Sequence, residues 1–231
     1  MTRVLPVVDA ANLADQFDAV ARTPGAPGPH EFTALLAQVV GETAFHANAV
    51  NKSTGAAGPF QFVKNTWLSM VQRHGAELGV KPELVKQIAT DAKGHLRVAD
   101  PKALHDILEL RHDVALSSRM ASKLMTENTA QLQHILHRAP TEPEVHLAFL
   151  LGAQGAGRLI GAAAATPDIA ADKIVRTAAA ANPSLFHDKS GKPRSAAEAV
   201  SFLAAKYHSD KAKVAAYAQI QSPAPKGTID I

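Results

Sequence analysis

The 231-residue chain contains no cysteine, which excludes disulfide bonds, thiolate metal sites and thiol nucleophiles. Aromatic residues make up only 5% of the sequence, whereas apolar residues as a whole make up 46%. A hydrophobic core must therefore be built mainly from Ala, Leu and Val side chains, which pack closely between helices. Segments in which β-branched and aromatic residues alternate with polar ones are almost absent, so the sequence predicts an all-α fold.

Hydrophobic and charged runs are also scarce. No stretch of about 18 uninterrupted apolar residues is present, so we expect no stable insertion into a membrane. The apolar run at the start of the chain is broken by Pro6 and Asp9, and we expect no secretory signal peptide there, which leaves the delivery route open. The formal charge is only +3, and Lys and Arg are scattered, so we expect no nucleic-acid partner.

Proline and glycine divide the sequence into three parts. Residues 1–29 combine a short amphipathic segment with a Pro/Gly-rich stretch, and we expect a helix followed by a linker. Residues 30–220 carry regular helical periodicity and are predicted to form a single domain. Residues 221–231 contain two prolines and are expected to form a flexible tail.

Apolar residues recur at helical spacing along this domain. One predicted helix begins at His30 and ends near Phe45, and a polar, glycine-containing loop over residues 46–62 follows it. The further predicted helices span 63–76, 81–92, 101–125 with a break near 111, 128–138, 144–151, 168–180, 195–207 and 209–219.

Glu42 lies in the last turn of the helix that is predicted to begin at His30. At about 100° per residue it falls close to Leu35, on the border of the apolar face. Partial desolvation and the negative end of the helix dipole would both favour the protonated carboxyl group. A carboxylic acid that stays protonated near neutral pH can act as a general acid. The alternative is an ordinary solvated glutamate at a helix end.

The residues around Glu42 form a specific pattern. Glu42-Thr-Ala-Phe45 is followed by Asn48-Ala-Val-Asn-Lys-Ser-Thr-Gly-Ala-Ala-Gly-Pro-Phe-Gln61. This pattern resembles the catalytic motif of the family 1 lytic transglycosylases, the goose-type-lysozyme-like enzymes of bacteria, which have Glu-Ser-x-Phe, a short segment ending in Ser, and Gly-Ala-x-Gly-x-x-Gln. The resemblance covers about 25 of the 231 residues. It implies a lysozyme-like fold and cleavage of the β-1,4 bond between MurNAc and GlcNAc in the glycan strands of peptidoglycan, in the periplasm or cell wall.

The resemblance also implies roles for individual residues. Glu42 would be the general acid and base. Thr43 stands where the family usually has Ser, and Pro59-Phe60 stands where it usually has Leu-Met. The residues that match the serine near the catalytic acid, the tight loop at the floor of the sugar cleft and the sugar-binding glutamine are Ser53, Gly55, Ala56, Gly58 and Gln61.

A weaker resemblance covers residues 142–157, where these enzymes usually carry a helix with Ala-Tyr-Asn-Ala-Gly-x-Gly. The Tyr and Asn of that pattern are absent here, and in the family that tyrosine supports the catalytic glutamate. His146 and Gln154 are therefore candidate substrate-binding residues that could take part of its role. Both could equally be packing or helix-surface residues.

Two reactions remain open. In a lytic transglycosylase one carboxyl group suffices, because the substrate's own N-acetyl group assists departure and its 6-hydroxyl closes a 1,6-anhydro ring. An inverting, hydrolytic muramidase of the lysozyme or endolysin type needs a second carboxylate to activate water. Asp91, Asp100 and Glu109 are candidates for it only by their order in the chain, and each could be a solvated helix residue.

A third interpretation is a non-catalytic peptidoglycan-binding module of a phage or secretion machine. The glutamate at the motif favours catalysis, because binding alone does not need a partly desolvated acid. No metal or cofactor is implied. His134 and His137 are three residues apart, but no third ligand stands nearby, so surface histidines are the simpler interpretation.

Overall fold

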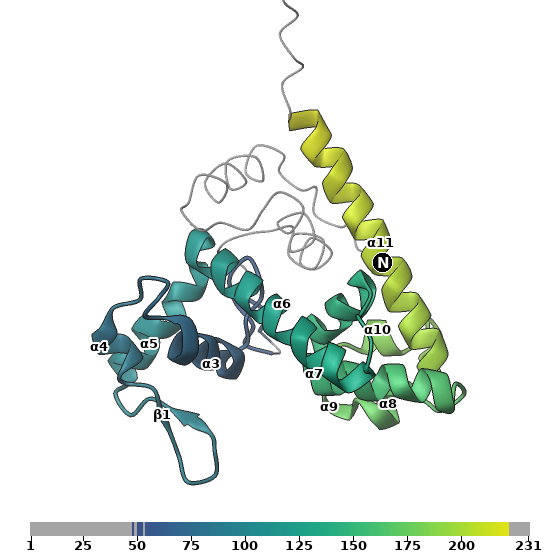
Figure 1. Cartoon of the computed structure of the whole chain (residues 1–231), viewed down its shortest axis with the longest axis horizontal. Coiled ribbons are helices and arrows are strands. Elements are labelled where there is room, and N and C mark those ends of the chain that lie inside the picture. Colours follow the sequence, from purple (N-terminus) through teal and green to yellow (C-terminus); the bar gives the residue numbers. More distant parts are fainter. Residues whose placement is uncertain (1–47, 49, 53, 222–231) are drawn as a thin grey trace, which may run out of the picture.

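The computed structural model describes residues 48, 50–52 and 54–221 (Figure 1). This part of the chain is mostly helical, which confirms the all-α prediction at the level of fold class. The segments 1–47 and 222–231 lie outside the described residues, and so do Glu42 and Ser53. The helices are α3 (Lys64–His74), α4 (Pro82–Val85), α5 (Pro101–Glu109), α6 (Val114–Leu136), α7 (Glu142–Ala165), α8 (Ala171–Ile174), α9 (Arg176–Ala181), α10 (Pro183–Phe186) and α11 (Ala196–Gln221), with the 3-10 turn η1 at Leu110–His112.

The first helical group consists of α3, α4, α5 and the first half of α6. Its core contains Trp67, which is fully buried and donates a 2.7 Å hydrogen bond from Nε1 to the carbonyl of Ile107. Around it pack the buried residues Phe60, Phe62, Leu68, Met70, Val71, Ile107, Leu116 and Met120. This core fixes the start of α3 against α5, and residues 50–62 come directly before α3.

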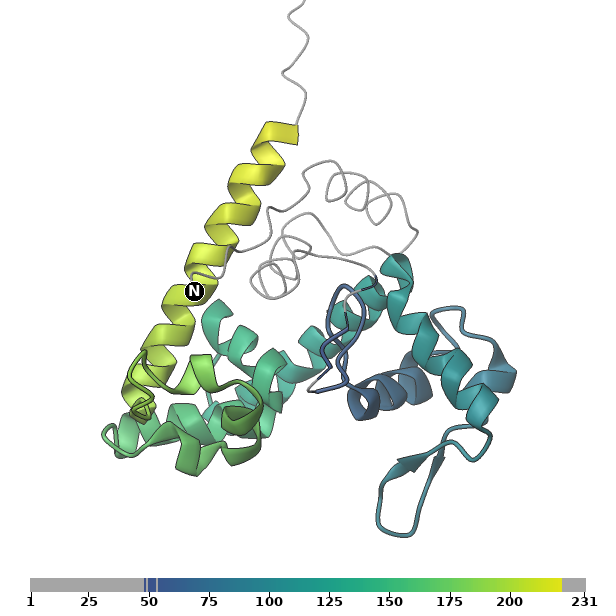
Figure 2. The same cartoon turned by 180° about the vertical axis from the view of Figure 1, so that it is seen from behind.

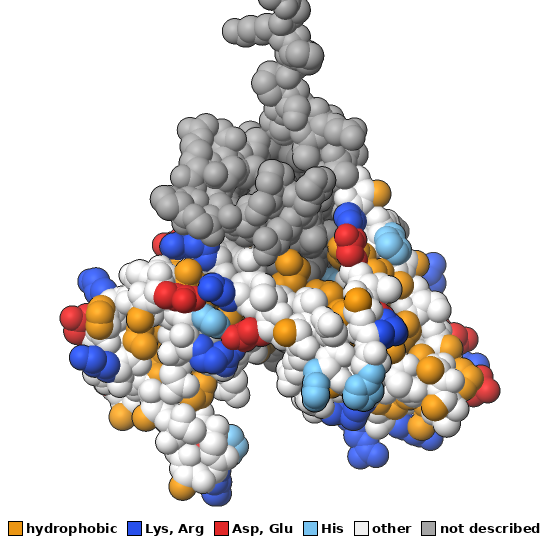
Figure 3. All heavy atoms as spheres, viewed as in Figure 1, with side chains coloured by type: hydrophobic (Ala, Val, Ile, Leu, Met, Phe, Trp, Pro, Cys, Tyr) orange, Lys and Arg blue, Asp and Glu red, His pale blue; other side chains and the backbone are white. Residues whose placement is uncertain are grey.

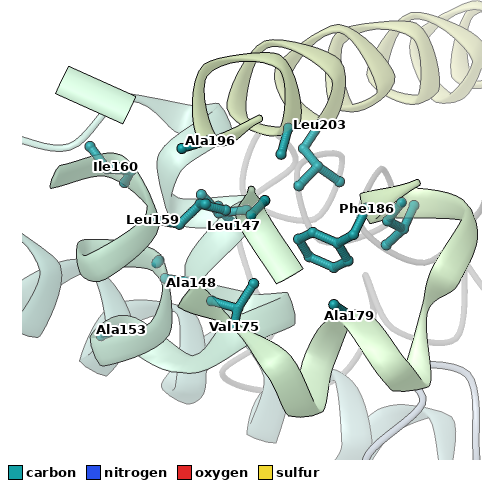
Figure 4. Close-up of a cluster of buried hydrophobic side chains, with 14 of the residues drawn as sticks. Leu147, Ala148, Ala153, Leu159, Ile160, Val175, Ala179, Phe186, Ala196 and Leu203 are labelled. Carbon is teal, nitrogen blue, oxygen red and sulfur yellow. The ribbon is translucent and has the colours of Figure 1, made fainter. Parts of the chain in front are cut away.

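The second helical group consists of the rest of α6 with α7 to α11. In Figures 1 and 2, α6 runs from one group to the other, and α7 lies between α6 and α11. Figure 4 shows its core, in which Leu147 and Leu159 of α7 meet Phe186 of α10 and Leu203 of α11. Alanines such as Ala148 and Ala196 are completely buried, so small side chains allow these helices to pack closely, as the composition predicts.

Helix α7 is the one described helix that is long and apolar enough to cross a membrane, and 44% of the relevant 18-residue window is buried. It makes its most extensive contacts with α6 and α11. That packing is typical of a core helix. Gly152 interrupts α7 with φ +69° and ψ 157°, a conformation that favours glycine, so the helix bends there and continues to Ala165.

Several predicted helix boundaries are confirmed and others are wrong. The break near 111 is confirmed, since Asp113 accepts a hydrogen bond from the backbone of Leu116 and caps α6. The helix predicted over 81–92 ends at Val85. An antiparallel hairpin follows α4 and is formed by β1 (Ala89–Thr90) and β2 (Leu96–Arg97).

The other corrections concern helix lengths. The part of the predicted segment 101–125 that follows the break and the predicted helix 128–138 form one helix, because α6 runs without interruption from Val114 to Leu136. The helix predicted over 144–151 corresponds to the part of α7 before the kink at Gly152, and a second helical stretch continues from there to Ala165. A single helix, α11, replaces the two predicted over 195–207 and 209–219. The segment predicted as one helix over 168–180 is split into α8 and α9 at Val175, which has φ −124° and ψ 49°.

Candidate functional site

The candidate site begins with the residues between position 50 and α3, which we call the glycine loop (residues 50–52 and 54–62). Ala57 forms isolated β-bridges with both Val50 and Phe62, so the loop doubles back twice on one residue. The first turn is closed by the Asn51 N–H, which donates to the Ala56 carbonyl at 2.8 Å. The second is closed by reciprocal Ala57–Phe62 backbone bonds of 3.1 and 3.2 Å. The loop is therefore a compact, hydrogen-bonded unit.

Gly58 is the position at which this loop requires glycine. Its φ is +77°, and a Cβ atom there would collide with the Arg111 carbonyl oxygen and lie 2.8 Å from the carbonyl carbon. The Gly58 carbonyl accepts a 2.9 Å bond from Nε2 of Gln61 and a 3.1 Å bond from the Gln61 backbone. Gln61 itself has φ +50°. The structure thus brings two motif residues, Gly58 and Gln61, into direct contact.

Gly55 and Ala56 occupy the first turn of the same loop. Gly55 has φ +69°, but a Cβ atom there would have no neighbour within 4 Å, so only the backbone conformation favours glycine at this position. Ala56 is buried. Ala56 and Gln61 line the cleft described below, whereas Gly55 and Gly58 do not.

Arg111 anchors the glycine loop and was not identified from the sequence. Its Nη1 donates to the carbonyls of Gly55 at 3.0 Å and Phe62 at 3.1 Å, and its Nε donates to Leu108 at 2.9 Å. Only 9% of the residue is exposed, and this burial lowers the pKa of its guanidinium. A buried cation shared among three carbonyls fixes the loop against η1. No sequence signal pointed to this contact, because its partners lie about fifty positions earlier in the chain.

A cleft of about 910 Å³ lies between the glycine loop and the second helical group. The surface is hollowed between the two helical groups in the space-filling view (Figure 3). Gly152, at the bend of α7, also lines the cleft. Residues lining the cleft include Asn51, Thr54, Ala56, Phe60 and Gln61 from the loop, Asn128 of α6, Phe149 and Arg158 of α7, and Lys173, Arg176, Thr177 and Asn182 beyond it.

The lining combines a majority of apolar residues with uncharged polar and cationic ones. Amide and hydroxyl side chains such as those of Asn51, Gln61 and Thr177 line the same cleft as Phe60 and Phe149. Carbohydrates are bound by this combination, because hydroxyl groups need hydrogen-bond partners and sugar ring faces need apolar contacts. Among the described lining residues there is no Asp or Glu.

His146 and Gln154 do not line the cleft. His146 is 4% exposed and lies between α7 and α11, with its ring 5.1 Å from that of Tyr207. Its Nδ1 is buried without a hydrogen-bond partner. Desolvation lowers the pKa of His146 to about 4, with Lys206 lowering it further and Asp210 opposing the shift. Gln154 is exposed, two residues beyond the bend of α7.

The three carboxylates considered as a second catalytic group also lie away from the cleft lining. Asp91 accepts backbone hydrogen bonds from Lys93 and His95 and thereby holds the turn of the hairpin, and these bonds lower the pKa of its carboxyl. Asp100 caps α5 by accepting from the Lys102 backbone at 2.9 Å. Glu109 is exposed at the end of α5.

No protein-family model matches the chain. Within the part of the chain that the structure describes, no three His, Asp or Glu side chains come together in a group that could hold a metal ion. His134 and His137 lie with ring centroids 6.3 Å apart on the outside of the second helical group.

Proposed function

We propose that this protein is a lytic transglycosylase with a lysozyme-like fold, which cleaves the MurNAc–GlcNAc bond of peptidoglycan with Glu42 as its single acid–base group. The observation that carries the proposal is the placement of the glycine loop. Gly58 and Gln61 are in contact, and Gln61 lines a cleft whose volume lies in the range of ligand-binding pockets. Glu42 comes shortly before this loop in the chain.

The proposed reaction needs one carboxyl group. The Glu42 carboxylic acid donates its proton to the glycosidic oxygen as the bond to C1 of MurNAc breaks, and the substrate's N-acetyl oxygen stabilises C1. The 6-hydroxyl oxygen of the same sugar then bonds to C1, while the Glu42 carboxylate takes the hydroxyl proton. Glu42 is regenerated as the acid, and no water is consumed. The cleft lining supports this proposal because its described residues offer amide and hydroxyl groups that can hydrogen-bond to a sugar.

The proposed site of action is the periplasm or the cell wall, where the substrate lies. We further propose that the chain works there without a metal or cofactor. A phage particle or a secretion machine would be a suitable means of delivery.

The proposal is tested by digesting purified peptidoglycan and weighing the released muropeptides by mass spectrometry. We expect products that are lighter by one water than reducing-end muropeptides, and we expect Glu42→Gln to abolish their release. Glu83→Gln is the matched control, because Glu83 is an exposed glutamate in the first turn of α4. Reducing-end products would instead show a hydrolytic muramidase, and binding to sacculi without any release would show a binding module.

A further inference from the structure

Three cations of the second helical group line the cleft. Arg158 lies in the second half of α7, Lys173 in α8 and Arg176 at the start of α9. We call these three residues the cationic wall. All three side chains are exposed, and the lining residues next to them in the chain, Ile174, Val175 and Thr177, carry no charge.

The cationic wall carries charge that the described part of the protein does not neutralise. None of the three side chains forms an ion pair or a side-chain hydrogen bond with a described residue. By contrast, Arg138 pairs with Glu144 on the surface of the same helical group. The nearest carboxylate in the sequence, Asp172, lies beside His187 at 3.7 Å instead. Because the described lining contains no Asp or Glu, this side of the cleft attracts anions.

The ligand that fits follows from the chemistry of the substrate class, so this inference rests on the proposed function. The sugar rings of peptidoglycan are uncharged, but each muramic acid carries a lactyl arm. That arm ends either in a free carboxylate or in a stem peptide with its own carboxylates. Arginine and lysine bind carboxylates through charge-assisted hydrogen bonds. From the charge distribution, we propose that the cationic wall binds the carboxylates of the stem peptide, while the glycine-loop residues that line the same cleft contact the glycan.

The test compares wild type with the triple variant Arg158→Gln, Lys173→Gln, Arg176→Gln on peptide-bearing glycan strands. The control variant Lys86→Gln, Lys93→Gln, Lys189→Gln removes the same charge from exposed lysines that do not line the cleft. We expect the cationic-wall variant to raise KM about tenfold with kcat nearly unchanged, which corresponds to about 1.4 kcal/mol. We expect the control variant to keep the wild-type KM. Added salt should weaken wild-type binding more than that of the cationic-wall variant.

Two further substrates identify the carboxylate. On strands whose carboxyl groups have been amidated chemically, the KM of wild type should rise about tenfold. The KM of the cationic-wall variant should change little. On strands stripped of peptides, a wild-type KM as high as that of the cationic-wall variant supports binding of the stem peptide. If the KM values of the two proteins still differ about tenfold on these strands, the cationic wall binds the lactyl carboxylate and the stem-peptide assignment is overturned. Equal KM values for the cationic-wall and control variants on every substrate would overturn the inference. If wild type cleaves no substrate, the proposed function fails instead, so the two failures are distinguishable.

Discussion

Replacing Gly58 by alanine tests whether the glycine loop has the conformation described here. The new Cβ atom would collide with the backbone carbonyl of Arg111, and a carbonyl cannot rotate away as the end of a flexible side chain can. Arg111 also holds Gly55 and Phe62 through its guanidinium. A shift of its backbone would therefore disturb the loop from both ends.

The expected magnitude has two parts. A side chain at a positive φ costs about 1–2 kcal/mol, and overpacking in a place that cannot relax adds about 1–3 kcal/mol. Gly58→Ala should therefore lower the free energy of unfolding by about 2–5 kcal/mol. Gly55→Ala is the matched control, because Gly55 has φ +69° but open space around its Cβ position. The free energy of unfolding of Gly55→Ala should fall only by the cost of the positive φ, about 1–2 kcal/mol.

The assay is urea unfolding of wild type and both variants, followed by circular dichroism of the helices. The difference between the two variants isolates the collision with Arg111, since the backbone cost is common to both. Muropeptide release by the same proteins shows whether the loop serves the reaction, and Gly58→Ala should reduce it more than Gly55→Ala. Equal stabilities of the two variants would refute the described contact between Gly58 and Arg111.

Three further predictions follow from buried polar groups. The pKa of His146 is about 4 in the folded protein and about 6.5 in the unfolded chain. The contribution of the neutral side chain to the free energy of unfolding is therefore complete above about pH 6.5 and is lost as the pH falls towards about 4. Between pH 7 and pH 5 wild type should therefore lose about 2 kcal/mol more than His146→Leu in urea unfolding, and equal losses would contradict the burial of a neutral imidazole. Arg111→Met removes three hydrogen bonds to carbonyls and should cost about 2–4 kcal/mol, with Arg111→Lys intermediate, whereas a thermal midpoint like that of wild type would exclude the anchoring role. Trp67→Phe leaves the Ile107 carbonyl without its buried donor and should cost about 2–3 kcal/mol; a loss below about 0.5 kcal/mol in the same denaturation assay would show that water replaces the indole.

The mostly helical class and the break between α5 and α6 could be predicted from the sequence because their causes are local. Asp100 and Asp113 cap the helices that follow them, and periodicity marks the helices themselves. The hairpin was missed because its turn depends on Asp91, whose side chain binds two backbone N–H groups, and on Gly94 at φ +81°. Asp91 lies inside the segment 81–92, whose apolar spacing resembles that of a helix, and Gly94 lies just beyond it.

The candidate site could be predicted only where it is continuous in the chain. Gly55, Ala56, Gly58 and Gln61 lie in one loop, and the structure brings them together. Arg111 binds the loop, and the cationic wall lines the same cleft, only because helices distant in the sequence pack together. No short motif encodes that packing. The helix predicted over 144–151 meets a kink at Gly152, and the second helical stretch of α7 that follows the kink carries Arg158. Phe149 and Arg158, on either side of the kink, line the same cleft.

The proposed cleavage of glycan strands by Glu42 without water can be tested by digestion in water enriched in oxygen-18. A lytic transglycosylase forms the anhydro ring from the sugar's own 6-hydroxyl, so the released muropeptides should be anhydro forms that contain no heavy oxygen. They should be absent with Glu42→Gln and present with Glu83→Gln. Incorporation of one heavy oxygen at the reducing end, or release by Glu42→Gln at the wild-type rate, would contradict the claim.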